Sequence, residues 1–190
     1  MLFLEKANQD MVSIERRRKF KNGMFISIDL NDSFKQDLFD AVKSLHIPNP
    51  LPAKDWHQTF IYLIKQFSED LLDDIKQASF NAEVSDLFRR EYPVTNIHLE
   101  NFTDTDGKPL LLLKYNAREL QIAQQLICKN YGVKHSYPNL MLHITLSYNI
   151  GAPYTSEQLA ILNNKLSHML DRTKKYSMQR IKVSPIKHDF

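Results

Sequence analysis

The sequence predicts an α/β fold of the α+β kind, built as two pseudo-symmetric halves with largely antiparallel sheets, outer helices and a central cleft. The first observation behind this prediction is that the order strand, helix, loop, strand occurs twice. The second is that each copy ends in the same pattern: His, any residue, Thr, an apolar residue, any residue and Tyr. The 190 residues fit a single domain, residues 1–190, with pseudo-repeat halves at about 24–63 and 110–148.

The first half begins with a strand of β-forming residues, Met24 to Leu30. Ser33, followed three residues later by Gln36, has the spacing of a capping box and predicts the start of a helix. Three prolines at positions 48, 50 and 52 then interrupt regular structure. The strand from Trp56 to Leu63 follows and contains the first copy of the motif.

The second half repeats this order. A turn at residues 104–107 leads into a strand from Leu110 to Tyr115, and apolar spacing predicts a helix from about Ala117. Gly132 is a typical helix stop because glycine tolerates the left-handed backbone found there. The second motif strand is predicted from Leu140 to Tyr148.

The remaining segments predict two more helices and three more strands. One helix begins near Ser68, and another begins at Thr155, where Gln158 completes a capping-box spacing. The strands are predicted at residues 80–88, 95–102 and 179–186. Many strands are joined by hairpin-length turns, which favours antiparallel sheets covered by helices on the outside.

The repeated motif carries the functional signal. Its members are His57, Thr59 and Tyr62 in one copy and His143, Thr145 and Tyr148 in the other. With seven His and seven Thr in the chain, chance predicts only about 0.26 His-x-Thr matches. In a strand, residues i and i+2 point to the same face, so each His shares a face with its Thr. Each Tyr has the opposite parity, which predicts a packing or positioning role.

Two histidines facing each other across a groove are a proton donor and acceptor, because an imidazole can be neutral or protonated near neutral pH. Cleavage of a phosphodiester needs a base to activate water or a ribose 2′-hydroxyl and an acid to protonate the departing oxygen. The hydroxyls of Thr59 and Thr145 can donate hydrogen bonds to the phosphate oxygens. His57, His143, Thr59 and Thr145 are therefore the predicted catalytic residues, and the arrangement requires no cofactor.

A metal site is the natural competitor for paired histidines. Zinc hydrolases typically add a third ligand at short spacing, and neither motif has an acidic residue or a second His close by. The single cysteine, Cys128, permits no internal disulfide, and its helical setting favours a core thiol over a nucleophile. We therefore predict no metal.

Charge and hydropathy limit the partners. The net charge of +3 is below that usual for proteins that bind duplex DNA. Basic residues cluster at 16–21 and again between 174 and 187, either as solvated surface or as a field that attracts a small polyanion. No apolar stretch approaches the ~20 residues needed to cross a bilayer, and the N-terminus lacks the order of a secretory signal. The sequence predicts a cytoplasmic protein without membrane contact.

The paired motifs resemble those of the 2H phosphoesterase superfamily, which has two His-x-Ser/Thr motifs on a bilobal α/β scaffold. His57, Thr59, His143 and Thr145 match that pattern. Within the superfamily, the segment from Tyr137 to Tyr148 and the compact size look most like the phage anti-CBASS phosphodiesterases. This resemblance implies cleavage of the 3′,5′ bonds of cyclic di- or trinucleotide immune signals, a counter-defence activity in the cytoplasm of the host.

The resemblance also implies groups that bind the nucleotide. Trp56, Tyr137 and Tyr154 flank the motif strands and are candidates for stacking on bases, although aromatic residues there also suit the core. Lys21 is a candidate for contact with phosphate. Two alternatives stay open: a 2′,3′-cyclic or 2′,5′-oligonucleotide phosphodiesterase acting on RNA, and a protein that binds and sequesters a nucleotide without cleaving it. The sequence leaves open which His is the base and the oligomeric state.

Overall fold

The computed structural model describes residues 23–64, 68–77, 82–136, 141–171 and 173–185. Its strands are β1 (Gly23–Leu30), β2 (Gln58–Ile64), β3 (Tyr92–Pro93), β4 (Thr95–Thr103), β5 (Pro109–Asn116), β6 (His143–Ser147) and β7 (Ser177–Pro185). Its helices are α2 (Asp32–Ser44), α3 (Glu69–Gln77), α4 (Ala82–Arg89), α5 (Arg118–Asn130) and α6 (Ser156–Met169), with a short 3₁₀ turn at Ala53–Asp55.

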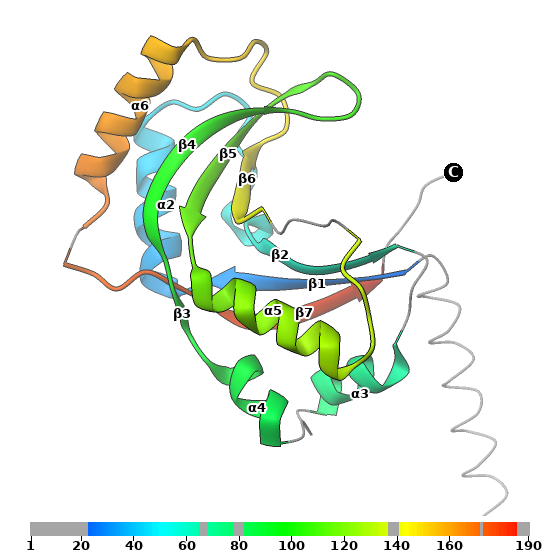
Figure 1. Cartoon of the computed structure of the whole chain (residues 1–190). Helices are drawn as coiled ribbons and strands as arrows, with labels where there is room; N and C mark the ends of the chain where they lie inside the picture. Colours follow the sequence, from blue (N-terminus) through cyan, green and yellow to red (C-terminus); the bar gives the residue numbers. More distant parts are fainter. Residues whose placement is uncertain (1–22, 65–67, 78–81, 137–140, 172, 186–190) are drawn as a thin grey trace, which may run out of the picture.

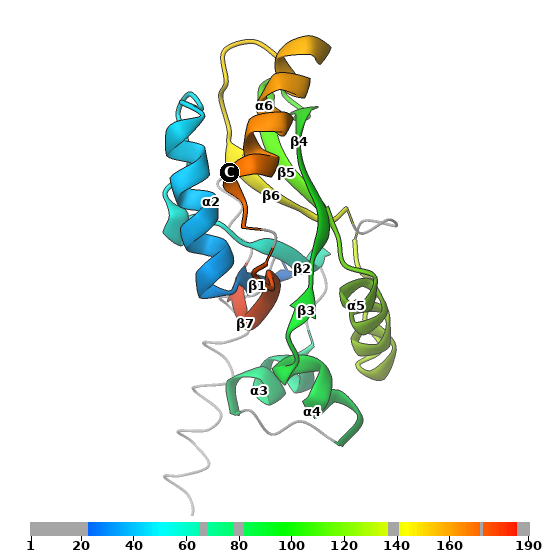
Figure 2. The same ribbon diagram turned by 90° about the vertical axis from the view of Figure 1, so that its left-hand side faces the viewer.

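The strands form two sheets in which every pair is antiparallel. The four-stranded sheet has the order β2-β1-β7-β3, and the three-stranded sheet has the order β4-β5-β6. Helices α2 and α6 lie beside the three-stranded sheet, whereas α3, α4 and α5 lie beside the four-stranded sheet (Figures 1 and 2). The α+β class, the antiparallel sheets and the outer helices predicted from the sequence are confirmed.

The two halves have the same strand arrangement. In the four-stranded sheet, which contains the strands of the first half, β1 pairs with the motif strand β2 on one side and β7 on the other. In the three-stranded sheet, which contains the strands of the second half, β5 pairs with the motif strand β6 on one side and β4 on the other. The motif strand is therefore the edge strand of its own sheet in both halves.

Each half covers the exposed edge of the other half's motif strand. The loop before β2 reaches β6, where the Leu51 N–H donates to the Leu146 carbonyl at 2.7 Å. The loop before β6 reaches β2, where the Ser136 N–H donates to the Tyr62 carbonyl at 2.8 Å. Edge strands expose unpaired backbone groups, so these hydrogen bonds pair part of each edge and join the halves.

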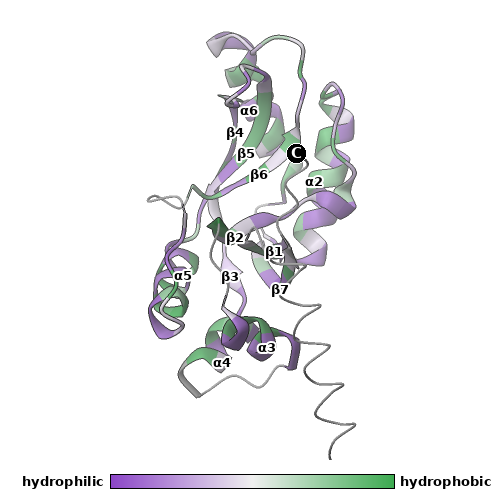
Figure 3. Ribbon diagram, turned by 90° about the vertical axis from the view of Figure 1, so that its right-hand side faces the viewer, coloured by the Kyte–Doolittle hydropathy of each residue, from purple (hydrophilic) through white to green (hydrophobic). Residues whose placement is uncertain are grey.

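The core follows the apolar pattern of the sequence. The inward residues of β1, Met24, Ile26, Ile28 and Leu30, are buried, as are Leu111 and Leu113 of β5. The hydropathy colouring alternates along α5, as expected for a helix with one apolar face (Figure 3). Leu120, Ala123 and Ile127 form that buried face. Every helix among the described residues is too short or too polar to span a bilayer.

Several element boundaries agree with the sequence and others differ. The capping box of Thr155 and Gln158 opens α6 as predicted. The cap of α2 is Asn31 rather than Ser33: the Asn31 Oδ1 accepts the Phe34 N–H at 2.9 Å. The helix therefore begins at Asp32, and Ser33 lies inside its first turn.

The strand predicted at residues 80–88 is wrong. Residues Ala82–Arg89 form α4, and residues 78–81 lie outside the described part of the chain. Val84 and Phe88 are both buried at a spacing of four, which is the period of one helix face. Valine and phenylalanine favour strands, which is why the sequence predicted one. In the folded chain, packing of the helix face outweighs this local propensity.

We expect Asn31→Ala to lower the free energy of unfolding by roughly 0.5–2 kcal/mol, because the helix loses its N-cap acceptor. The Asn31 amide also donates to the Lys175 carbonyl at 2.9 Å, so the substitution releases the segment before β7 as well. Ser33→Ala is the matched control and should change stability by less than about 0.5 kcal/mol. Urea unfolding measures both, and equal losses would contradict Asn31 as the cap.

Candidate active site

A β-bulge follows the Thr in the first motif. On the neighbouring strand, Ile26 pairs with Ile61 and Ser27 pairs with Thr59, so Phe60 is an extra residue in β2. Phe60 and Ile61 are both buried, whereas His57 and Thr59 are half-buried on the opposite face. The bulge thus turns two consecutive side chains into the core.

The second motif has the same bulge at the equivalent position. Leu112 pairs with Thr145 and Leu111 pairs with Ser147, so Leu146 is the extra residue in β6. Leu146 and Ser147 are both buried, and His143 and Thr145 are half-buried. A bulge of this kind changes the direction of the side chains that follow it. The two motifs are therefore equivalent in backbone as well as in sequence.

The bulge corrects the expected position of Tyr62. Alternation along a regular strand predicts that Tyr62 points away from His57 and Thr59, but the extra residue restores it to their face. Tyr62 lines the same cavity as Thr59, and its ring contacts the edge of Phe25 at a centroid distance of 6.2 Å. Tyr148 follows the end of β6 and is 57% exposed.

Both histidines are held by the carbonyl two residues earlier in the chain. The His57 Nδ1 lies 2.7 Å from the Asp55 carbonyl oxygen, and the His143 Nδ1 lies 2.9 Å from that of Met141. A carbonyl only accepts, so Nδ1 carries the donated proton in each ring. The Nε2 atom of a neutral ring is then left with its lone pair, as a general base needs.

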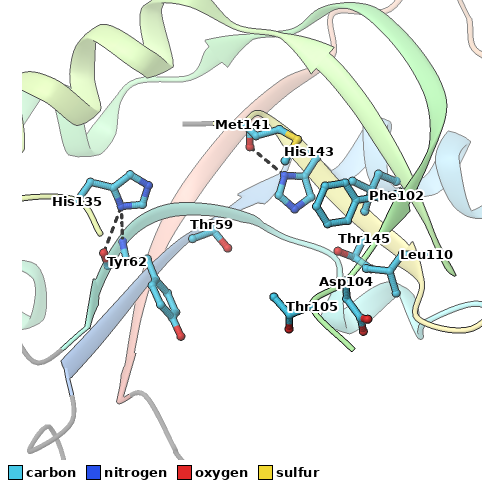
Figure 4. Close-up of a pocket in the computed structure, with 11 residues that line it drawn as sticks. Thr59, Tyr62, Phe102, Asp104, Thr105, Leu110, His135, Met141, His143 and Thr145 are labelled. Atoms are coloured by element: carbon cyan, nitrogen blue, oxygen red, sulfur yellow. Dashed lines mark hydrogen bonds between the residues drawn. The ribbon is translucent and has the colours of Figure 1, made fainter. Parts of the chain in front are cut away.

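Residues of both halves line one cavity of about 500 Å³ (Figure 4). Its volume is within the range typical of small-molecule sites. In the close-up, Thr59 lies between the side chains of Tyr62 and His143. The lining residues are Thr59, Tyr62, Phe102, Asp104, Thr105, Leu110, Leu112, His135, Met141, His143 and Thr145.

The cavity contains three of the four predicted catalytic residues: Thr59, His143 and Thr145. His57 is not among its lining residues. Its ring packs edge-on against Phe25, with 5.3 Å between the ring centroids. The charge of His57 nevertheless acts on His143. The structure thus brings the two motifs together, although 86 positions separate their histidines in the sequence.

The surroundings of His143 favour its neutral form. Burial lowers its pKa below the ordinary value of 6.5, and the positive charges of Lys114 and His57 lower it further. The hydrogen bond to the Met141 carbonyl acts in the opposite direction. Lys114 pairs with His143 across β5 and β6, and its ammonium lies 2.9 Å from a carboxylate oxygen of Glu100. His143 is therefore suited to accept a proton at neutral pH.

His135 is a cavity residue that the sequence did not reveal. The Tyr62 N–H donates to its Nδ1 at 2.9 Å, and the Tyr62 carbonyl already accepts from Ser136. The His135 Nδ1 also lies 3.2 Å from the Tyr62 carbonyl oxygen, and burial lowers the pKa of this imidazole. His135 has no motif around it, and only the exchange of loops between the halves brings it to β2. Phe102, Asp104, Thr105 and Met141 also line the cavity, and no local motif marks them in the sequence.

The predicted nucleotide-binding residues have different positions. Trp56 is 1% exposed and belongs to the core, so it lacks the open ring face that stacking on a base requires. Tyr154 is half-buried against the core and outside the cavity lining, with its backbone bonded to the Asn101 side chain. Tyr137 and Lys21 lie outside the described residues.

Metal ligands and the cysteine thiol bear on two other kinds of chemistry. Among the described residues, no three His, Cys, Asp or Glu side chains gather in a group that could hold a metal ion. Cys128 is buried in α5, and burial raises the pKa of its thiol, which disfavours the reactive thiolate. Cys128 is thus a core residue, as its helical setting predicted.

Most of the chain is similar to a known protein family. Residues 22–176 match the family model described as Anti-CBASS protein Acb1. The chain belongs to this family. The matched region contains both motifs, the bulge after each of them and all the residues that line the cavity.

Individual members of the family are moderately similar to the chain. The Anti-CBASS protein Acb1 of Vibrio phage KVP40 is 28% identical over 128 residues, which cover 67% of this chain and 73% of the relative. The protein of the same name from Enterobacteria phage T4 is 25% identical over 134 residues, covering 70% and 77%. Among solved structures, TT0787 of Thermus thermophilus aligns over 85% of this chain and 83% of its own, with 17% identity and a TM-score of 0.43.

We expect the His143 imidazole to titrate below 6.5, its ordinary value. Replacing Lys114 by Met removes a positive charge and leaves the Glu100 carboxylate without that partner, so the His143 pKa should rise. Lys114→Arg keeps the charge and is the matched control. Following the ring proton signals by NMR from acid to alkaline pH gives the three values, and a midpoint that is unchanged in Lys114→Met would contradict this electrostatic account.

Proposed function

We propose that the chain is a metal-independent phosphodiesterase that cleaves the 3′,5′ bonds of cyclic di- or trinucleotide immune signals. His57 and His143 are the acid and base, and Thr59 and Thr145 hold the phosphate. The observation that carries this proposal is the matched arrangement of the motifs: in both halves Nδ1 is bonded to the carbonyl two residues back, and both threonines face one cavity.

We assign the two roles from the surroundings of His143. His143 has its pKa lowered by burial and nearby positive charge, so it is the base. His57 is then the acid, since cleavage needs one proton acceptor and one proton donor. The reaction needs one imidazole that accepts a proton and one that donates a proton, so the reactive form of the pair carries a single proton.

The proposed reaction starts from a ribose 2′-hydroxyl next to the phosphodiester. The Nε2 of His143 takes the hydroxyl proton, and the 2′-oxygen forms a bond to phosphorus. The bond from phosphorus to the 5′-oxygen breaks, and protonated His57 gives its proton to that oxygen. The products are a 2′,3′-cyclic phosphate and a free 5′-hydroxyl, so the ring is opened. The hydroxyls of Thr59 and Thr145 stabilise the negative charge that develops on the phosphate oxygens.

Membership of the Anti-CBASS protein Acb1 family supports a counter-defence role in which the cyclic signal is destroyed in the host cell. The family relatives come from Vibrio phage KVP40 and from Enterobacteria phage T4. The cavity supports a small ligand, because apolar side chains such as Phe102, Leu110 and Leu112 lie beside the polar groups of the motifs. Stacking and polar recognition of a nucleotide need this combination.

The decisive experiment compares four substrates in excess EDTA. These are 3′,3′-cyclic GMP-AMP, cyclic tri-adenylate, 2′,5′-oligoadenylate and an RNA with a 2′,3′-cyclic phosphate, with products identified by mass spectrometry. We expect linear products from the cyclic oligonucleotides and a loss of at least ~100-fold in kcat for His57→Ala and for His143→Ala. Chelation should not reduce the rate.

His98→Ala is a matched control for these variants. The His98 Nδ1 also lies 2.9 Å from the carbonyl two residues back, that of Asn96, but His98 is not among the cavity residues. Its loss should leave turnover within about twofold. Turnover of the RNA substrates alone would move the function to RNA processing, and recovery of every ligand unaltered would indicate sequestration.

We further expect the rate to depend on pH as a bell. The rising limb of kcat/KM should have its midpoint below 6.5, because it follows deprotonation of His143 in the free enzyme. The Lys114→Met variant should move the midpoint of this limb to higher pH, whereas Lys114→Arg should leave the midpoint unchanged. A rising limb that stays fixed in Lys114→Met while the NMR midpoint of His143 moves would assign the base to another group.

A further inference from the structure

Gln58, the middle residue of the first motif, is fully buried although its side chain is polar. Its exposed fraction is 0%. Burying an amide without partners costs free energy, so its hydrogen bonds have to be formed inside the protein. Most of its partners belong to the other half of the molecule.

The Gln58 amide uses all of its hydrogen-bonding capacity. Its Oε1 accepts the backbone N–H of His143 at 2.6 Å and the hydroxyl of Tyr115 at 2.9 Å. Its Nε2 donates to the Thr59 carbonyl at 2.5 Å and to the Met141 carbonyl at 3.4 Å. A backbone N–H only donates and a carbonyl only accepts, so the orientation of the amide is fixed by its surroundings.

The Met141 carbonyl is also the acceptor for the His143 ring. It therefore receives two hydrogen bonds, one from the His143 Nδ1 at 2.9 Å and one from Gln58. The same amide thus holds both the backbone nitrogen of His143 and the carbonyl that orients its imidazole. Burial raises the pKa of Tyr115 well above its usual value, which keeps its hydroxyl protonated as a donor to Gln58.

The second motif has no side-chain amide at the position of Gln58. The residue that corresponds to Gln58 is Ile144, which is buried and apolar. Gln58 of the first half therefore acts on the histidine of the second half, and the arrangement is not reciprocated. This asymmetry coincides with the different surroundings of the two rings.

We infer that Gln58 is a positioning residue that fixes the His143 ring in the tautomer with its proton on Nδ1, so that Nε2 is ready to accept a proton. The inference rests on the proposed function of His143 as the base. It makes the first motif a contributor to the base as well as to the acid: His57 takes part in the chemistry, and its neighbour in the sequence holds the partner histidine.

Gln58→Met tests this inference because the side chain is similar in size but makes no amide hydrogen bonds. We expect kcat to fall by roughly 10- to 100-fold, by analogy with metal-bound histidines that lose an orienting hydrogen bond, with KM changed by less than about twofold. Long-range ¹H–¹⁵N spectra should show His143 changing from one tautomer to a mixture, while His57 stays unchanged. This spectroscopic readout does not depend on activity, so it separates a failure of the inference from a failure of the proposed function.

Tyr115→Phe is the matched control. It also removes a buried hydrogen bond to Gln58, but the bonds to His143 and Met141 remain. We expect a loss of stability in both variants and a changed His143 tautomer and kcat only in Gln58→Met. The inference is overturned if folded Gln58→Met keeps the kcat and the His143 spectrum of the unaltered protein, or if Tyr115→Phe changes both as strongly.

A measurement on the unaltered protein covers the case in which Gln58→Met does not fold. The hydrogen bond from the His143 N–H to the Gln58 oxygen should give a scalar coupling between the His143 backbone ¹⁵N and the Gln58 side-chain ¹³Cδ, and slow exchange of that amide proton. Fast exchange without a coupling would overturn the inference.

Discussion

The structure depends on how two edge strands meet at the centre of the molecule. β2 and β6 belong to separate sheets, so backbone ladders hold each strand to its own half but not to the other. The Gln58 amide joins them by bonding to the backbone at His143 and Met141. Its burial makes each of these hydrogen bonds costly to lose, because an unpaired amide cannot turn to water there. The histidine environment of one half is thereby set by the other half.

The exchange of loops also joins the two halves, at the free edges of these strands. The segment before each motif satisfies the backbone of the opposite motif strand, through Leu51 on β6 and Ser136 on β2. His135 enters the cavity as part of this exchange. A cavity lined from both sequence halves is the consequence. Neither half contains the complete site, so we expect the site to be lost when the halves are separated.

Equivalent backbones with different surroundings suit a duplicated motif to the two chemical roles proposed for its histidines. The bulges and the carbonyl partners of Nδ1 are matched, which places both imidazoles in comparable frames. Lys114 pairs with His143 across the strands, and Gln58 accepts the His143 N–H. Both residues belong to the surroundings of His143 alone. An acid and a base require such a difference, because two identical imidazoles would favour the same protonation state.

The sequence by itself determined the fold class, the two strand-helix-strand halves and the residues of both motifs, because alternation, capping signals and a repeated pattern are local properties. It also indicated that the motif threonines lie on the faces of their histidines. The bulges after Thr59 and Thr145 were invisible, since they arise from how two strands pair, and the expected direction of Tyr62 failed for that reason. Trp56 is in the core, and His135 and Gln58 are at the site, because of contacts between segments far apart in the chain. Tertiary structure alone decided these positions, because hydrogen bonds and burial across the two halves have no counterpart in local sequence.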